Sequence, residues 1–335
     1  MNKNIIITGG SGFIGTNLVN YLNKKNYKIF NIDKISYCST SENFKIINKK
    51  NYFFYKTNIS NLDKVNLIFK KNNIGTVIHL ASESHVDRSI DSPFNFIKEN
   101  ILSTTSFYEN INLLVKKKII SMPNIIHVST DEVFGSLTKK DAHEKMSFLP
   151  NSPYAASKAS TEHIARSFVK TFGMKISVIR LCNNYGPYQF TEKFIPTCII
   201  NAIKNTPIPI YGNGQNIREW MHVSDSCKAI ELIIKNFKTN VEYNIGSSVK
   251  ISNINIAKII LKTMKKKIKL SYISDRPAHD KRYSLNSKKF KKKFNWKPTF
   301  NLQRGIEDTI NWYLTNDKWL KRSYLKYKGQ RLGKI

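Results

Sequence analysis

The chain is short of cysteines, acidic residues and long apolar runs. Its four cysteines, Cys38, Cys182, Cys198 and Cys227, form no C-x-x-C pair, so we interpret them as reduced packing residues. No run of about 18 apolar residues is present that would span a membrane. The early apolar stretch Ile5 to Ile7 is too short for a cleavable signal. We therefore expect a cytoplasmic protein with no membrane partner and no metal site.

The shortage of acidic residues leaves a large positive charge. Lys and Arg number 55 against 23 Asp and Glu, which gives a net charge of +32. Such an excess attracts phosphate backbones and raises the hypothesis of a nucleic-acid-binding protein. However, the lysines are scattered and accompany abundant Asn and Ile, and these three residue types share A/T-rich codons. No nucleic-acid-reading motif accompanies the charge, so we expect no specific nucleic-acid partner.

Length and hydrophobic content predict a globular α/β protein. A chain of 335 residues, 41% of them hydrophobic, can bury one large core with a smaller lobe beside it. Short β-branched runs alternate with helical patterns, as a doubly wound parallel sheet of the Rossmann type requires. The expected strands are Asn4 to Thr8, Lys28 to Ile32, Tyr52 to Thr57, Thr76 to Leu80, Ile125 to Ser129 and Lys175 to Leu181. Two longer segments, Pro93 to Lys116 and Pro153 to Phe172, predict amphipathic helices, one of which could form a dimerisation surface.

A glycine-rich loop follows the first expected strand. Gly9, Gly12 and Gly15 are spaced three apart, immediately before the run Thr16 to Leu22, which predicts a helix. Such glycines let the backbone turn tightly and approach a pyrophosphate, which the N–H groups and dipole of the helix start attract. Taken alone, the loop could be only a turn.

The end of the second expected strand gives this loop its context. Asp33 stands 18 residues after Gly15, where a carboxylate can accept hydrogen bonds from an adenosine ribose. Its charge would repel a 2′-phosphate, so the sequence favours NAD over NADP. Lys34 beside it moderates that preference.

A tyrosine and a lysine lie in the segment that Pro153 should open as a helix. The i,i+4 spacing of Tyr154 and Lys158 puts phenol and ammonium on one helix face, where the cation can lower the pKa of the tyrosine. The tyrosine could then act as a base. In isolation, the same spacing is more often a half-exposed aromatic residue beside a solvated lysine.

Thr130, Asp131 and Glu132 end the expected strand that starts at Ile125. This strand end and the start of the Pro153 helix should meet at one crevice of the parallel sheet. An acid, a base and a phenol within reach of one sugar ring suit a redox-assisted elimination. The alternative is a pair of acids at the end of a strand on a surface loop.

With these residues in place, the sequence resembles the extended short-chain dehydrogenase/reductase family, and within it the enzymes that dehydrate dTDP-glucose. The resemblance is carried by TGGSGFIG (Thr8 to Gly15), LASESHVDRSI (Leu80 to Ile90), STDEVFG (Ser129 to Gly135), YAASK (Tyr154 to Lys158), NNYGPYQFTEKFIP (Asn183 to Pro196), YGNGQNIREWMHVSD (Tyr211 to Asp225) and RPAHDKRY (Arg276 to Tyr283). The first and fourth motifs are common to the superfamily, and the others are more specific. Asp131 narrows the choice most, because related epimerases usually carry small residues there and related decarboxylases place a serine before the glutamate.

The resemblance implies a three-stage reaction on one sugar. Tyr154, assisted by Thr130, would take the proton of the C4 hydroxyl while a hydride passes from C4 to NAD. Glu132 would then remove the C5 proton, and Asp131 would protonate the departing C6 hydroxyl. The hydride would return to C6, which gives a 4-keto-6-deoxy sugar and regenerates the cofactor. A UDP-sugar 4-epimerase or decarboxylase stays an alternative, and the choice between thymine and uracil stays open.

The resemblance also implies which residues hold each ligand. The expected NAD contacts are Gly9, Gly12, Phe13, Ile14, Gly15, Asp33, Lys34, Asn58, Ile59, Leu80, Ala81, Tyr154 and Lys158. The expected contacts with the nucleotide sugar are Ser84, Asn183, Glu192, Lys193, Arg218, Asn253, Arg276, His279 and Tyr283. A guanidinium suits a diphosphate because its planar fork donates to two oxygens at once. Asn58 departs from the family pattern, where an aspartate is common.

The expected domains follow the two ligands. Residues 1–181, with a return segment at about 218–247, should form the NAD-binding Rossmann domain. Residues 182–217 and 248–335 should form a smaller lobe for the nucleotide sugar. We expect dTDP-glucose as the substrate and a homodimer as the assembly.

Overall fold

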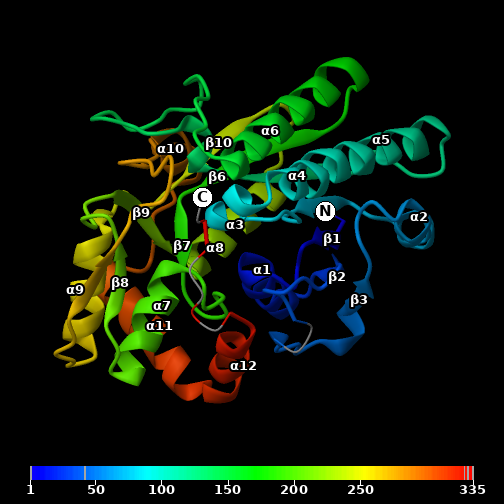
Figure 1. Ribbon diagram of the computed structural model, residues 1–335. Helices are drawn as coiled ribbons and strands as arrows, with labels where there is room; N and C mark the ends of the chain where they lie inside the picture. The colour runs from blue at the N-terminus through cyan, green and yellow to red at the C-terminus, as the bar shows by residue number, and fades with distance from the viewer. Residues whose placement is uncertain (1, 41–42, 328, 330–331, 334–335) are drawn as a thin grey trace.

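The larger lobe of the protein is built on a seven-stranded, wholly parallel sheet. The computed structural model describes residues 2–40, 43–327, 329 and 332–333. The strand order is β10-β6-β5-β4-β1-β2-β3 (Figure 1). The strands are β1 (Asn4–Thr8), β2 (Lys28–Asp33), β3 (Tyr52–Lys56), β4 (Thr76–His79), β5 (Asn124–Thr130), β6 (Ile176–Leu181) and β10 (Glu242–Ile245). The predicted Rossmann-type fold is confirmed, with its topological switch between β1 and β4.

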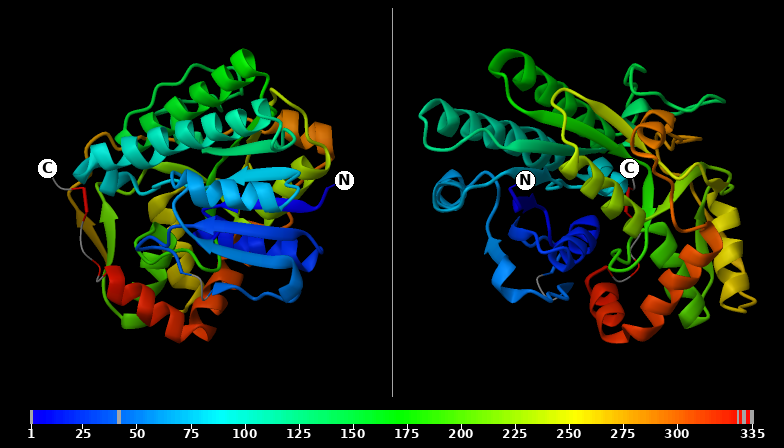
Figure 2. Two further views of the ribbon diagram at one scale, coloured as in Figure 1. Left: turned by 90° about the vertical axis from the view of Figure 1, so that its right-hand side faces the viewer. Right: turned by 180° about the vertical axis from the view of Figure 1, so that it is seen from behind.

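Helices cover both faces of this sheet (Figure 2). One face carries α1 (Phe13–Lys24) and α8 (Val223–Lys235), and the other carries α2 (Leu62–Lys71), α5 (Ser103–Lys116) and α6 (Pro153–Phe172). Successive residues of a strand point to opposite faces, so Ile7 packs in one buried cluster with Leu18 and Ile230. Ile6 packs in the second cluster with Phe107. The strands are therefore apolar on both sides, as the sequence pattern indicated.

The expected helix Pro93 to Lys116 contains a widened turn. It consists of α4 (Pro93–Phe96), a π-helical segment (Ile97–Leu102) and α5, and α3 (Val86–Asp91) precedes it. Asn100, in the π-helical segment, donates to the Glu83 carbonyl at 3.0 Å and to Ser157 Oγ at 2.8 Å. The irregular turn thereby ties the loop after β4 to the start of α6, where the site lies.

The smaller lobe contains two short sheets and its own core. A three-stranded sheet has the order β11-β9-β7, and β8 pairs in parallel with β12. These strands are β7 (Asn183–Tyr185), β8 (Ile208–Tyr211), β9 (Ile217–His222), β11 (Lys250–Ser252) and β12 (Leu270–Ile273). The helices are α7 (Phe194–Lys204), α9 (Asn253–Thr263), α11 (Leu302–Thr315) and α12 (Asp317–Tyr327). Ile199, Ile260 and Ile306 pack together between them.

The segment 218–247 is divided between the two lobes. Its first residues lie in β9, which pairs with β7 and β11 of the smaller lobe. The chain then returns, because α8 packs against α1 and β10 pairs with β6. A further helix, α10 (Lys288–Phe294), also contacts β10. None of the helices in the described ranges is both long and apolar enough to cross a bilayer.

Candidate active site

The glycine-rich loop lines a cavity at the carboxyl ends of β1 and β2. Gly9 has a φ of +69°, and a Cβ there would lie 2.7 Å from the Ala81 backbone, so only glycine fits. The helix α1 begins at Phe13, and the residue before it, Gly12, has no side chain to cap the N–H groups of the first turn. A glycine cradle and an uncapped helix start together fit the pyrophosphate of a dinucleotide.

The carboxylate at the end of β2 is held in place by backbone N–H groups. Asp33 accepts hydrogen bonds from Ser11 N at 2.9 Å and from Ile35 N at 2.7 Å. Lys34 next to it is neutralised by Glu83 at 3.0 Å and by Glu99 at 2.9 Å. The positive charge of Lys34, which moderated the predicted preference for NAD over NADP, is thus paired with two acids. It is less able to attract a 2′-phosphate, which favours NAD further.

All thirteen expected cofactor residues line this one cavity, whose volume is about 220 Å³. Tyr154 and Lys158 form its inner end, next to Val128 and Ser129 of β5. Asn58 also lines it, and its amide donates to Glu99 Oε2 at 3.3 Å. The glycine-rich loop, the Asp33 carboxylate and Tyr154 therefore line one shared cavity.

Thr130 connects the carboxyl groups of Asp131 and Glu132 to the end of β5. A short 3-10 turn, Asp131–Phe134, follows the strand, and Thr130 Oγ1 accepts from Glu132 N at 3.3 Å. The same hydroxyl donates to Asp131 Oδ1 at 3.2 Å, whereas Asp131 Oδ2 is buried without a hydrogen-bond partner among the described residues. Burial, with the charges of Glu132 and Glu219, raises the pKa of Asp131 well above its ordinary value. Asp131 therefore holds its proton more strongly than an ordinary aspartic acid.

Glu132 has a different environment. Burial raises its pKa, but the cations Arg276, Arg218 and Lys193 oppose this effect. Two adjacent carboxyl groups therefore differ in their tendency to hold a proton, as an acid and base pair requires.

Tyr154 and Lys158 lie at the start of α6. Ser152 caps this helix by accepting from Ala155 N at 3.1 Å, and Pro153 occupies its first turn. Burial lowers the pKa of Lys158 to about 8, and its ammonium donates to the Val128 carbonyl at 2.8 Å. The pKa of Tyr154 is raised by burial and by Glu132, and its hydrogen bond with Thr130 opposes the increase. We expected Lys158 to lower the pKa of Tyr154, but in the protein without ligands this pKa is raised.

A second cavity of about 240 Å³ lies on the side of the smaller lobe. It is lined by Glu132 and by all nine expected substrate residues. Asn183 Oδ1, Asn253 Oδ1 and Arg276 Nε are buried there without partners among the described residues. Such atoms are costly unless a polar ligand satisfies them, so this cavity suits a ligand with many hydrogen-bonding groups.

The two cavities meet along a shared wall. Ser84, Gln189, Glu192 and Lys193 line both of them. Lys193 Nζ donates to the Ser84 carbonyl at 2.9 Å, which joins α7 of the smaller lobe to the loop after β4. The two cavities are therefore neighbours, with Tyr154 lining the first and Glu132 lining the second.

The sequence did not indicate several residues that hold the lining side chains in place. Arg88 binds Glu192 at 2.9 Å and stacks on the Tyr37 ring at 3.9 Å. Asp87 accepts from Arg276 Nη1 at 2.8 Å and from Tyr211 at 2.9 Å, and so orients that arginine. Asp87 and Arg88 lie in the motif LASESHVDRSI, but their spacing alone gives no hint of partners that are over 100 residues away in sequence.

The chain belongs to the GDP-mannose 4,6-dehydratase family, whose model matches residues 6–309. It is 36% identical over 345 residues to a probable dTDP-glucose 4,6-dehydratase of Sinorhizobium fredii, and this match covers 98% of each chain. The crystal structure of dTDP-glucose 4,6-dehydratase from Bacillus anthracis in complex with NAD matches with a TM-score of 0.87 at 35% identity, over 96% of this chain and 99% of that chain. The crystal structure of the Streptomyces venezuelae dTDP-glucose 4,6-dehydratase, also with NAD bound, matches with a TM-score of 0.89 at 31% identity, over 94% of this chain and 98% of that chain.

Proposed function

We propose that this protein is an NAD-dependent hydro-lyase that converts dTDP-glucose to dTDP-4-keto-6-deoxyglucose. The observation that carries the proposal is the pair Asp131 and Glu132 at the end of β5, because Glu132 lines the cavity that also holds Arg218 and Arg276. Burial and two neighbouring acids raise the pKa of Asp131, which favours a proton donor, and Glu132 faces the second cavity. The dehydratases to which the chain is similar support this choice over an epimerase, which needs no acid for a leaving hydroxyl.

The residues divide the reaction between them. When bound, NAD supplies a positive charge beside Tyr154 and exchanges a hydride with C4 and then C6 of the sugar. Tyr154, oriented by Thr130, takes the proton of the C4 hydroxyl. Glu132 takes the C5 proton, which the new 4-keto group has made acidic, and later returns one. Asp131 gives its proton to the C6 hydroxyl as water leaves.

The smaller lobe should hold the nucleotide. Arg218 and Arg276 line the second cavity and present guanidinium groups suited to the diphosphate. His279 stands beside them, and burial with the two arginines lowers its pKa to about 4, so it is neutral near pH 7. Its one N–H donates from Nδ1 to Asp275 Oδ1 at 2.5 Å, so the other ring nitrogen can accept a hydrogen bond without adding charge.

Isotope labelling tests the function. We expect dTDP-glucose with deuterium at C4 to give a 4-keto-6-deoxy product with that deuterium at C6, and turnover in heavy water to place solvent deuterium at C5. UDP-glucose under the same conditions tests the base preference. Label that stays at C4 would indicate an epimerase, and the Tyr154→Phe variant is the control, because it should form no product.

We also propose a homodimer in the cytoplasm. Four large apolar side chains along α4, the π-helical segment and α5 are exposed: Phe94 (73%), Ile97 (45%), Leu102 (56%) and Leu113 (46%). Leu102 and Leu113 lie three turns apart on one helix face, where a partner helix could cover them. Light scattering should show a dimer that Leu102→Glu with Leu113→Glu dissociates, whereas Leu314→Glu on α11 should not. The four unpaired thiols support a reducing compartment.

A further inference from the structure

A segment of the smaller lobe reaches the catalytic glutamate. The phenol oxygen of Tyr283 lies 3.4 Å from Glu132 Oε2. The same oxygen makes a shorter hydrogen bond with Asp280 Oδ2, and Asn151 Nδ2 donates to Asp280 Oδ1 at 2.6 Å. The reaction as derived above uses neither Asp280 nor the Tyr283 hydroxyl, although both side chains are buried.

The phenol has one proton for two carboxyl groups. Since Asp280 is the closer acceptor, it holds the proton of Tyr283, and a lone pair of the phenol oxygen then faces Glu132. A lone pair cannot form a hydrogen bond with a carboxylate, because both are acceptors. It can accept a hydrogen bond from a carboxyl group that has gained a proton. Burial and the charges of Glu132 and Asp280 raise the pKa of Tyr283, so the phenol itself does not ionise.

We propose that Asp280 is a positioning residue for Glu132: it holds the Tyr283 hydroxyl so that the phenol oxygen accepts a hydrogen bond from Glu132 once Glu132 carries the C5 proton. In this step the C5–H bond breaks and an O–H bond forms on Glu132, while Tyr283 and Asp280 keep their own protonation states. Reprotonation at C5 reverses the transfer. The inference rests on the proposed function, because it concerns the base of that reaction.

The charges around Glu132 explain why such help is needed. The groups that face it are three cations, two acids and two phenols: Arg218, Arg276, Lys193, Asp131, Asp280, Tyr154 and Tyr283. The cations favour the carboxylate and so weaken Glu132 as a base. The negative charge of Asp280 and the lone pair of Tyr283 favour the protonated form instead, which strengthens the base.

The segment is also tied to the diphosphate-binding arginine. Arg218 Nη2 donates to the Asp280 carbonyl at 3.0 Å, and its guanidinium lies 4.2 Å from the centre of the Tyr283 ring. The side chain of Asp280 therefore acts on the base, and its backbone acts on Arg218.

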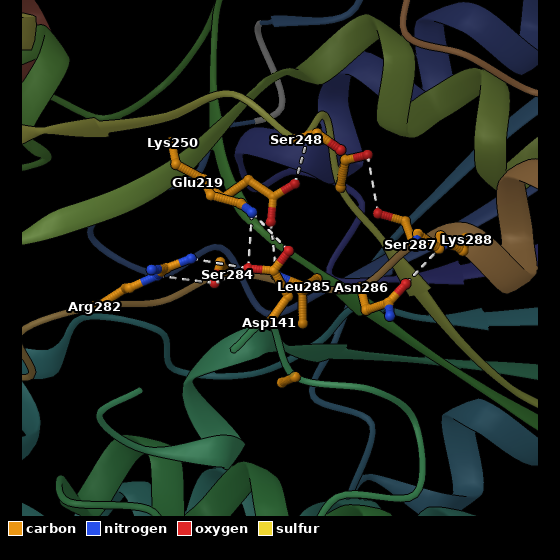
Figure 3. Close-up of polar contacts among 12 residues, drawn as sticks. Asp141, Glu219, Ser248, Lys250, Arg282, Ser284, Leu285, Asn286, Ser287 and Lys288 are labelled. Carbon is orange, nitrogen blue, oxygen red and sulfur yellow. Dashed lines mark hydrogen bonds and ion pairs between the residues drawn. The ribbon is translucent and has the colours of Figure 1, made fainter. Parts of the chain in front are cut away.

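Two other carboxylates, Glu219 and Asp141, hold residues on either side of Tyr283 (Figure 3). Glu219 accepts from Leu285 N at 2.7 Å, and Asp141 accepts from Ser284 Oγ at 2.9 Å and Arg282 Nη2 at 2.9 Å. Asp141 thus anchors the same segment as Asp280 but has no contact with the phenol. The Asp141→Asn variant is therefore a matched control for a merely structural effect.

The test compares Asp280→Asn, Tyr283→Phe and Asp141→Asn in single turnovers of dTDP-glucose. An asparagine amide can donate to the phenol oxygen, which turns the Tyr283 proton toward Glu132 and stabilises its carboxylate. In Asp280→Asn we expect the acid limb of the pH–rate profile for C5 proton loss to shift to lower pH by about one unit. The rate on the plateau of this profile should be slower. Tyr283→Phe should show the same shift, and Asp141→Asn should show none.

The rate of C4 oxidation, followed by the absorbance of reduced nicotinamide, separates a chemical role from a structural one. It should be unchanged in Asp280→Asn, and deuterium at C5 should slow the overall reaction more than in the wild type. Equal slowing of both steps, an unmoved acid limb, or the same shift in Asp141→Asn would each overturn the inference. If Asp280→Asn does not fold, Tyr283→Phe decides alone. A wild-type protein that yields no 4-keto-6-deoxy product would instead refute the proposed function.

Discussion

The Asp131→Asn substitution removes an acidic proton donor and keeps the size and shape of the side chain. An amide has the size of the carboxyl group, and its oxygen can still accept the hydrogen bond that Thr130 Oγ1 makes at 3.2 Å. It cannot supply a proton to the C6 hydroxyl. Asp131 is 3% exposed and its Oδ2 has no partner among the described residues, so the site offers no ready replacement except Glu132.

The expected loss follows from these contacts. A positioned proton donor is typically worth about 10²–10⁴-fold in rate, or about 3–5 kcal/mol of activation barrier. Because Glu132 carries the C5 proton at this stage and could partly substitute, we expect the lower half of that range. Oxidation at C4 should stay within about threefold of the wild type, since Asp131 is not needed for it.

Single-turnover absorbance is the assay. In Asp131→Asn, reduced nicotinamide should form at a normal rate and persist, together with a 4-keto sugar that retains its C6 hydroxyl. Tyr154→Phe is the contrasting control, and there the absorbance should not rise. Thermal unfolding should show both variants folded. Equal loss of oxidation and elimination in both variants would refute the division of roles.

Two other predictions concern the cofactor and the core. The protein should copurify with NAD. Asp33→Asn should weaken NAD binding, measured by calorimetric titration, by about tenfold, because a charged acceptor for the ribose is lost. An enzyme that is active only with added NADP would contradict this prediction. Burial lowers the pKa of His79 from 6.5 to about 3, so the folded state favours the neutral imidazole. The free energy of unfolding should therefore fall by up to about 1.4 kcal/mol per pH unit as the pH drops below 6.5. His79→Gln should flatten this slope in urea titrations between about pH 7 and 5, and a slope identical to the wild type would show that His79 contributes nothing.

Local patterns in the sequence were enough to predict residues that line the first cavity together. The glycine spacing and the acid at the end of the second strand depend on neighbouring residues, and a parallel sheet brings its strand ends together in a known way. The i,i+4 spacing of Tyr154 and Lys158 likewise placed both on one face of α6. It could not show that Lys158 donates to the Val128 carbonyl, because that contact depends on how α6 packs against β5.

Long-range pairing is what the sequence could not supply. The run Ile217 to His222 has the pattern of a strand, but nothing in it says that it pairs with β7 and β11 instead of the large sheet. Asp280 and Glu132 are separated by 148 positions, and their link through Tyr283 exists only because both lobes fold against each other. Such contacts have no periodicity that a sequence pattern could reveal.

The few acidic residues of the chain set much of the chemistry of the site, and among the described residues only three lysines, Lys34, Lys158 and Lys193, line its two cavities. Near the cavities, Lys34 is paired with Glu83 and Glu99, and Arg276 is paired with Asp87. Partly buried pairs of this kind are screened by salt much less than exposed charges. The surplus behind the net charge of +32 is carried mostly by exposed lysines, whose diffuse field attracts any anionic ligand without ordering it. That surplus can therefore favour the encounter with a nucleotide diphosphate, while the buried acids decide which proton moves once the ligand is bound.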